Sequence, residues 1–359
     1  MILMPVSGLL AGCASPPPEP LQPLSSELVV ATSELPQQQL LDIGLIVFEP
    51  GLPEGQPGPN PAPVYTGVRQ AEARYLPYVL RQTLEASGQW GAVRVLPEAD
   101  PSAELLISGT ILQSDGVELT LQIRAWDASG REWLNKVYID VADWPYYRDR
   151  PVYTSDPFVD LYNSVANDLN EARAQLSPAA LQRIIDISQL RYAAALSPQA
   201  FSGYLVTQDD GTVRLSRLPA LNDPMVARLE RLRQSEYLFI DALDQQYAAF
   251  YREMGPTYTL WRRYSYGQTR ELEELRQSAR RGSRGFAAMK QSYDTYREAK
   301  IQQQALKELA ESFNTEVQPT VMDLQGKVVE LSGTVAAQYT DWRRLLQAIY
   351  QEETGLPLE

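Results

Sequence analysis

The chain has 359 residues, 44% of them hydrophobic and 21% charged, a balance typical of folded globular proteins. Its 32 basic and 45 acidic residues leave a formal net charge of −13, which disfavours nucleic acid as a partner because binding to phosphates needs a basic face. There is no histidine and only one cysteine, Cys13, so an intrachain disulfide and a thiolate zinc cage are excluded, and we expect neither metal nor cofactor.

The residues before Cys13 indicate a lipid anchor. The stretch Leu9-Leu10-Ala11-Gly12-Cys13 resembles the bacterial lipobox, in which small residues precede an invariant cysteine. The resemblance implies that residues 1–12 are a signal sequence and that Cys13 carries diacylglycerol and an amide-linked acyl chain such as palmitate. No Lys or Arg precedes Cys13, although signal sequences begin with positive charge, so we expect the true start codon to lie upstream of Met1. The alternative is an incidental thiol in an unstructured terminus.

Residues 13–39 are expected to form a tether after the lipidated cysteine. Residues 14–23 read ASPPPEPLQP, a composition that favours extended polyproline and holds a domain away from a membrane surface. Ala14, rather than Asp, follows the cysteine, and by the usual lipoprotein rule this implies sorting to the outer membrane, facing the periplasm.

Residues 40–145 predict a small α/β domain. Apolar runs at 42–49, 90–96 and 103–113 are typical of buried strands, and residues 67–87 show helical spacing. The alternating runs 117–127 and 131–141, each preceded by a turn that contains Gly, predict antiparallel strands. One β-α-β unit followed by an antiparallel meander predicts an α+β sandwich with its helix on one sheet face.

The sequence of this domain resembles that of several bacterial envelope proteins. "IGLIVFE", "SGQWGAVRVL", "ADPSAELLISGTI" and "ASGREWLNK" are similar to the amino-terminal domain of TolB, the curli-secretion lipoprotein and outer-membrane flagellar lipoproteins. In these relatives the domain packs and assembles, often in rings, and carries no catalytic residues. The resemblance therefore implies a homo-oligomer and transfers no active site; the alternative is an unrelated α/β sandwich.

Residues 155–359 predict a mostly helical domain, a long hairpin or bundle, with a small β-hairpin within 203–218. Helices are expected at 158–176, 177–196, 225–254, 258–279, 286–317 and 321–353, with a break at Gly255-Pro256. The tyrosines concentrated between 237 and 266 are expected to form core or interface; a ligand-binding box is the alternative.

Two features of the helical region favour contacts with partners. Arg276, Arg280, Arg281 and Arg284 form a basic break in an acidic protein, which is either a solvated hinge or a contact for lipid phosphates or an acidic partner. Gly326 and Gly333 lie on the predicted last helix, where two glycines on one face suggest close packing by another helix.

No catalytic motif appears: the sequence has no phosphate-binding glycine loop, no GxSxG elbow and no calcium loop. We therefore expect a non-enzymatic lipoprotein that acts as a scaffold or accessory component of a cell-envelope complex, with the membrane and other envelope proteins as partners. Two alternatives stay open: a periplasmic enzyme that acts on glycan through paired carboxylates, which predicts a pocket holding two carboxyls of divergent pKa, and a small-ligand carrier, which predicts a large cavity among the helices.

Overall fold

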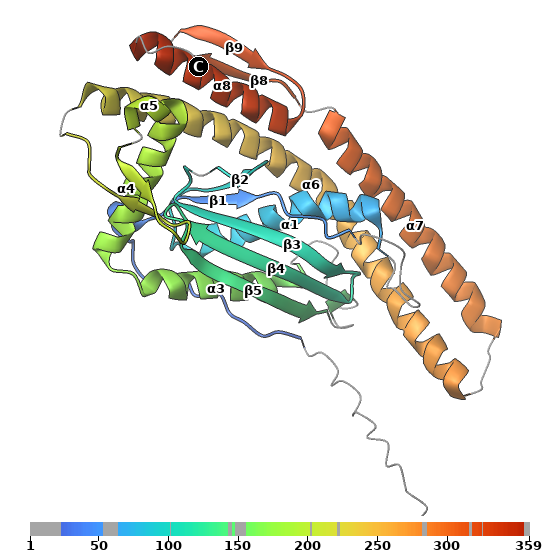
Figure 1. The fold of residues 1–359 in the computed structure, drawn as a ribbon. Coiled ribbons are helices and arrows are strands. Elements are labelled where there is room, and N and C mark those ends of the chain that lie inside the picture. The colour runs from blue at the N-terminus through green and yellow to red at the C-terminus, as the bar shows by residue number, and fades with distance from the viewer. Residues whose placement is uncertain are drawn as a thin grey trace, which may run out of the picture.

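The computed structural model of the protein describes residues 23–52, 64–100, 102–142, 146–147, 156–201, 203–220, 223–281, 286–315, 318–324 and 326–354. Within these residues the chain has an α+β fold, in which a five-stranded mixed sheet with flanking helices is followed by a long helical region (Figure 1). The predicted fold class is confirmed.

The sheet has the strand order β2-β1-β3-β4-β5. Its strands are β1 (Ile43–Ile46), β2 (Val93–Leu96), β3 (Leu105–Ser114), β4 (Glu118–Asp127) and β5 (Glu132–Val141). Strand β1 pairs in parallel with β2 and β3, and helix α1 (Thr66–Ser87) connects β1 to β2. Strands β3, β4 and β5 form the antiparallel meander that the alternating sequence predicts.

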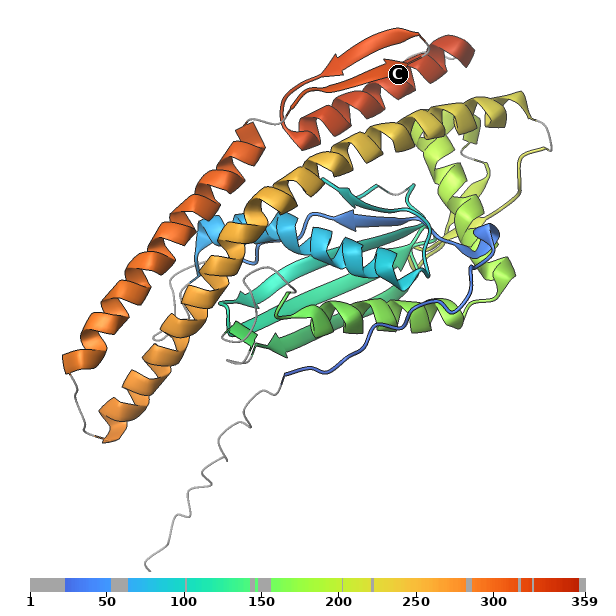
Figure 2. The same cartoon turned by 180° about the vertical axis from the view of Figure 1, so that it is seen from behind.

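Helices cover one face of this sheet fully and the other only in part. Helices α1 and α3 (Val159–Ala174) cover the same face of the sheet (Figure 2). Leu121 of β4 lies opposite Tyr138, whose hydroxyl bonds Asp168 of α3, and Leu121, Ile123 and Ala125 on this face are 0–1% exposed. On the opposite face, helix α6 covers the β2 edge, whereas Val137 and Ile139 of β5 remain 45% and 38% exposed. The meander therefore presents an open face on the side shown in Figure 1.

The remaining elements follow in chain order. They are α4 (Pro178–Leu196), α5 (Pro198–Phe201), the hairpin β6 (Leu205–Thr207) and β7 (Val213–Leu215), α6 (Pro224–Arg281), α7 (Phe286–Thr315), the hairpin β8 (Thr320–Leu324) and β9 (Lys327–Leu331), and α8 (Val335–Thr354). A short 3-10 helix, η1 (Gln37–Gln39), precedes β1. Helices α6 and α7 form a long antiparallel hairpin whose far end projects beyond the sheet (Figure 1).

The predicted break at Gly255-Pro256 is wrong, because α6 runs through it as a 58-residue helix. Proline cannot donate a hydrogen bond to the carbonyl of Arg252, and inside a helix it costs about 3 kcal/mol. The flanking side chains of Met254 and Tyr258 are 0% and 1% exposed, so packing on both sides of the proline outweighs this local cost.

The predicted helix 321–353 is also wrong over residues 321–334, where the chain forms the hairpin β8–β9 before α8 begins. Gly326 sits at the turn with φ +79°, and Gly333 precedes α8 with φ +99°, backbone conformations that favour glycine. Neither glycine lies in a helix, so the predicted helix packing at Gly326 and Gly333 is corrected. The spacing of Leu324, Val328 and Leu331 is typical of a helix. The β-branched pair Val328-Val329 and the glycine at the turn favour strands instead, and the chain forms strands.

Close helix packing at a glycine occurs elsewhere, at Gly67 in the first turn of α1. A Cβ added to Gly67 would lie 2.6 Å from Cβ of Lys307 and 3.2 Å from its Cα, so α7 approaches α1 at a distance that only glycine allows.

The segment before β1 is fixed along α3 and the edge of β5. The Leu24 N–H donates to the Asp140 carboxylate at 2.9 Å, and the Val29 N–H donates to the Asn167 side-chain carbonyl at 2.8 Å. The Asn167 amide in turn donates to the Glu27 carbonyl at 2.8 Å. The described chain therefore starts on the α3 side of the sheet (Figure 2).

Across the described parts of the chain, no helix combines the length and the apolar character that a bilayer crossing requires.

Candidate functional site

The residues singled out from the sequence lie mostly at the margins of the described structure. Cys13 and Arg284 fall outside the described residues. Arg276, Arg280 and Arg281 belong to the last turns of α6, at the far end of the α6–α7 hairpin, and only their backbone is described (Figure 1).

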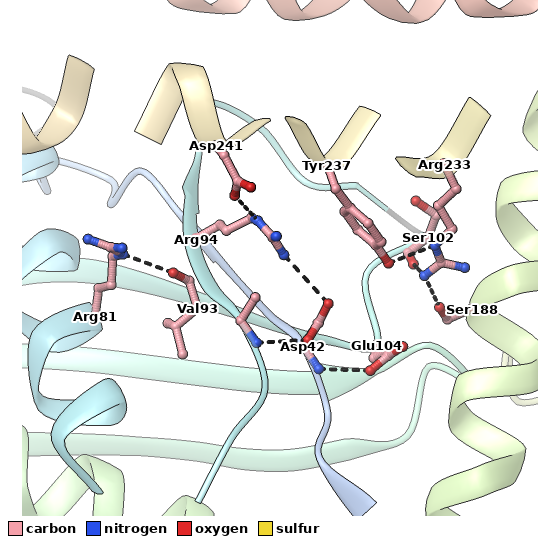
Figure 3. Close-up of polar contacts among 11 residues, drawn as sticks. Asp42, Arg81, Val93, Arg94, Ser102, Glu104, Ser188, Arg233, Tyr237 and Asp241 are labelled. Atoms are coloured by element: carbon pink, nitrogen blue, oxygen red, sulfur yellow. Dashed lines mark hydrogen bonds and ion pairs between the residues drawn. The ribbon is translucent and has the colours of Figure 1, made fainter. Parts of the chain in front are cut away.

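Charged side chains gather where α6 meets the sheet (Figure 3), and the cluster continues to Arg343 of α8; we call this site the polar seam. Its charged members are Asp42, Arg94, Asp100, Glu104, Arg233, Glu236, Asp241, Asp244 and Arg343.

The edge strand β2 is held to α6 by two carboxylates three residues apart on that helix. Arg94 Nε donates to Asp241 Oδ1 at 2.6 Å, and Arg94 Nη1 lies 3.5 Å from Asp42 Oδ2 (Figure 3). Asp244 Oδ1 accepts a hydrogen bond from the Val95 N–H of β2 at 3.0 Å, and Asp244 Oδ2 pairs with Arg81 of α1 at 3.1 Å. Asp241 and Asp244 thus point at the sheet and α1, although the sequence pattern alone is equally typical of a solvated helix surface.

About two turns before Asp241 on α6, Arg233 connects that helix to α4. Its Nε donates to Tyr237 Oη at 2.7 Å and its Nη2 donates to Ser188 Oγ at 2.7 Å (Figure 3). Nearby, Glu104 accepts a hydrogen bond from the Asp42 N–H at 2.7 Å. Burial and the neighbouring Asp42 carboxylate raise the pKa of Glu104 to about 7.

At the α8 end of the seam, Arg343 faces two carboxylates. Arg343 Nη1 lies 3.0 Å from Asp100 Oδ1, and Arg343 Nε lies 3.7 Å from Glu236 Oε1. Burial and the charge of Asp100 raise the pKa of Glu236 to about 7. Burial also raises the pKa of Asp100, but this effect is outweighed. The Arg343 charge and hydrogen bonds from Ser102 and Tyr339 hold the pKa of Asp100 below its usual range.

The polar seam has the electrostatics of a paired-carboxylate catalytic site, but its cavity is too small to hold a sugar substrate. Its carboxyl groups have divergent pKa values, as the glycan-acting alternative predicts. The cavity between Glu104 and Glu236 measures about 40 Å³, room for roughly three waters at 10–15 Å³ each. A sugar ring does not enter such a space, so the geometry assigns the seam to joining α6 and α8 to the sheet.

A larger cavity of about 370 Å³ lies between α1, the start of α3 and the middle of α6. Five tyrosines line it, and we call it the tyrosine pocket; they are Tyr75, Tyr146, Tyr147, Tyr251 and Tyr258. Its volume falls within the roughly 300–1,000 Å³ that is usual for small-ligand sites.

A buried ion pair forms part of the wall of the tyrosine pocket. Arg262 Nη1 donates to both carboxylate oxygens of Asp156 at 2.8 Å, and the Phe158 N–H donates to Asp156 Oδ1 at 2.9 Å. The guanidinium carbon of Arg262 lies 4.2 Å from the Tyr258 ring centroid and 4.9 Å from that of Phe158. Burial disfavours the charged form of Arg262, yet Asp156 keeps the pKa of Arg262 well above its usual value. Arg262 therefore stays charged within the pocket wall.

The tyrosines of the pocket are partly tied into the core. Tyr258 Oη donates to Glu72 Oε1 at 2.6 Å, and Tyr147 Oη donates to the Gly116 carbonyl at 2.6 Å. Tyr75 stacks on Tyr251 with ring centroids 4.8 Å apart. Tyr75, Tyr147 and Tyr258 are 6%, 5% and 1% exposed, whereas Tyr146 and Tyr251 are half-buried, so the last two supply the accessible rings.

No metal centre is found in the described ranges, where no three His, Cys, Asp or Glu side chains come together in a way that would bind an ion.

Comparisons with known proteins give no assignment. No family model matches the sequence, no curated protein is significantly similar to it, and no solved structure matches it significantly.

Neither site was predicted from the sequence, although each left a trace there. The tyrosine-rich stretch 237–266 was predicted to be core or interface, and Tyr247 is indeed 2% exposed, but Tyr251 lines the pocket. The Gly255-Pro256 pair in the pocket wall was the local signal, and it was interpreted as a helix break.

Proposed function

We propose that the protein is an outer-membrane-anchored periplasmic lipoprotein that acts, without catalysing a reaction, as a scaffold or accessory component of a cell-envelope complex. The observation that carries the proposal is the sequence Leu9–Cys13 followed by the proline-rich residues 14–23. Several acyl chains on Cys13, at about 0.8 kcal/mol per buried CH₂, hold a protein on a bilayer essentially permanently.

The fixed segment around Leu24 to Val29 supports this arrangement. Because the chain is held along α3 from residue 24 onward, only the ten peptide units from Cys13 to Pro23 remain as tether. Fully extended, they span at most about 35 Å. The folded body would therefore stay close to the membrane, with the α3 side of the sheet nearest the attachment point.

Lipidation and sorting can be tested on single residues. We expect the full chain, expressed with its upstream coding sequence, to incorporate an alkyne-labelled palmitate and to fractionate with the outer membrane. Cys13→Ser should abolish the label, and Ala14→Asp should keep the label but move the protein to the inner membrane. Ser15→Ala is the matched control and should change neither. An unlabelled wild-type protein, or one found in the cytosol, would refute the anchor.

The scaffold role is tested by affinity purification from solubilised membranes. We expect a defined set of envelope proteins to co-purify with the wild-type chain and to be depleted with Cys13→Ser at equal expression. If only the tagged chain is recovered in both cases, the scaffold role fails even where the anchor is confirmed.

The described structure offers the glycan-acting enzyme no supporting geometry, because its paired carboxyls border a 40 Å³ cavity. The ligand-carrier alternative gains a specific observation in the tyrosine pocket, which is developed next.

A further inference from the structure

The tyrosine pocket combines four properties that restrict its ligand: its size, its aromatic walls, its charge balance and its hydrogen-bond acceptors. All four properties come from residues of this chain and do not depend on the lipid anchor.

The charged groups that line the pocket disfavour strongly charged ligands. Arg262 and Asp156 form an ion pair at 2.8 Å and neutralise one another, and the third charged lining residue, Arg252, is exposed and donates from Nε to the Ala248 carbonyl of its own helix. A ligand phosphate or carboxylate would have to compete with Asp156 for the guanidinium, and a ligand cation would have to displace Arg262 from the Tyr258 and Phe158 rings, which already hold a cation. The pocket therefore suits a neutral ligand.

The acceptors of the pocket favour a ligand with several hydroxyl groups. Pro256 has no N–H to offer the carbonyl of Arg252, so that carbonyl lacks its ordinary helical donor at the pocket wall. Among the described residues, Asp156 accepts three hydrogen bonds, and because a carboxylate has about four lone-pair sites, these residues leave one acceptor site on Asp156 unused. An acyl chain carries no donors for these groups and would cover them without pairing them, which costs up to about 1–3 kcal/mol for each group that it shields fully from water.

The tyrosine rings supply flat surfaces for the rest of the ligand. Tyr146 and Tyr251, on separate elements, are the half-buried rings of the pocket. A pyranose ring has two apolar C–H faces and a rim of hydroxyl donors, and so it matches rings that carry acceptors beside them. The absence of a side chain at Gly255 leaves space next to these groups, since the nearest atom to an added Cβ, Tyr75 Oη, is 4.0 Å away.

We propose that the tyrosine pocket is a binding site for a neutral glycan, occupied by one or two sugar rings that stack on tyrosine and donate hydrogen bonds to Asp156 and the Arg252 carbonyl. It binds the glycan and does not cleave it, because a glycosidase needs two carboxyl groups flanking the bond and Asp156 is the one carboxylate among the described pocket residues.

The test is isothermal titration calorimetry on the full chain carrying Cys13→Ser, a change that removes the need for detergent. The probes are cellotetraose, maltotetraose and chitotetraose, with palmitate and a decaproline peptide as comparators. We expect at least one of the three oligosaccharides to bind with a dissociation constant on the order of a millimolar or tighter.

Two substitutions place that binding in the pocket. Thr259→Trp fills the pocket without removing an existing core contact, and Tyr251→Ala removes one accessible ring; each should weaken binding about tenfold or more. Tyr296→Ala, at a tyrosine that is 45% exposed on α7, is the matched control and should leave binding unchanged. Thermal melting followed by circular dichroism verifies the fold of all variants. If Tyr251→Ala melts at a clearly lower temperature than wild type, the test rests on Thr259→Trp alone.

Three results would overturn the proposal. They are failure of all three oligosaccharides to bind at about 10 mM, binding that persists unchanged in Thr259→Trp, and binding of only palmitate or decaproline. Because lipidation plays no part in the titration, failure here leaves the proposed membrane anchor standing, and failure of the anchor leaves this site standing.

Discussion

Replacing Glu236 by Gln should make the protein more stable at pH 8 and change its stability at pH 5 by less than about 1 kcal/mol. Burial and the Asp100 charge raise the pKa of Glu236 from its usual 4.5 to about 7, so the folded state binds this proton more tightly than the unfolded chain does. Stability is then highest below the unfolded pKa and falls as pH rises toward the folded pKa, that is, between about 4.5 and 7. At about 1.36 kcal/mol per pKa unit, the 2.5 units of difference correspond to about 3 kcal/mol as an upper bound.

The assay is equilibrium urea unfolding at pH 5, 6, 7 and 8 on wild type and Glu236→Gln. Glutamine is neutral throughout and resembles the protonated glutamate, so the variant should exceed wild type by up to about 3 kcal/mol at pH 8 and by less than about 1 kcal/mol at pH 5. Glu352→Gln, at an exposed residue of α8, is the control and should follow wild type. Identical pH profiles for wild type and Glu236→Gln, or a variant that is less stable at pH 8, would refute the assignment of Glu236 as a strained buried carboxylate.

Three further changes test other parts of the fold. Arg262→Met leaves the Asp156 carboxylate buried without its partner and should reduce the free energy of unfolding by about 3–5 kcal/mol, whereas adding Asp156→Asn should recover part of that loss; additive losses in urea titrations would contradict the pairing. Gly67→Ala should destabilise the α1–α7 contact by about 1–3 kcal/mol, because the new Cβ meets the Lys307 backbone, and an unchanged melting temperature would count against that contact. Asn167→Ala should release the segment before β1, seen as faster proteolysis within residues 23–35 at nearly constant global stability, and equal cleavage rates would show that other contacts hold it.

Local patterns in the sequence were enough to predict the sheet. The alternation in 117–127 and 131–141 sets one face of β4 and β5 toward the helices, and a one-residue register slip would expose Leu121 and Ile123, so the pattern leaves little choice. The same local view failed at Pro256 and in β8–β9, where apolar spacing fits two structures and long-range packing chooses between them.

The two sites were beyond prediction for a related reason. Arg94 meets Asp241 across 147 residues of chain, and Arg262 meets Asp156 across 106. No local spacing encodes such pairs, and acidic residues such as Asp241 and Asp156 are equally common on solvent-exposed surfaces. What the sequence did carry was composition, in the form of many tyrosines and a proline within a helical stretch.

Because α6 is unbroken, the projecting α6–α7 hairpin and the sheet are connected by one continuous helix. At 1.5 Å per residue its 58 residues extend about 87 Å, from the contacts with α4 and β2 to the arginine-bearing tip where α7 turns back. A force that a partner applies at the tip would therefore be transmitted along α6 to the β2 edge and to the wall of the tyrosine pocket, with α1 as the point of support.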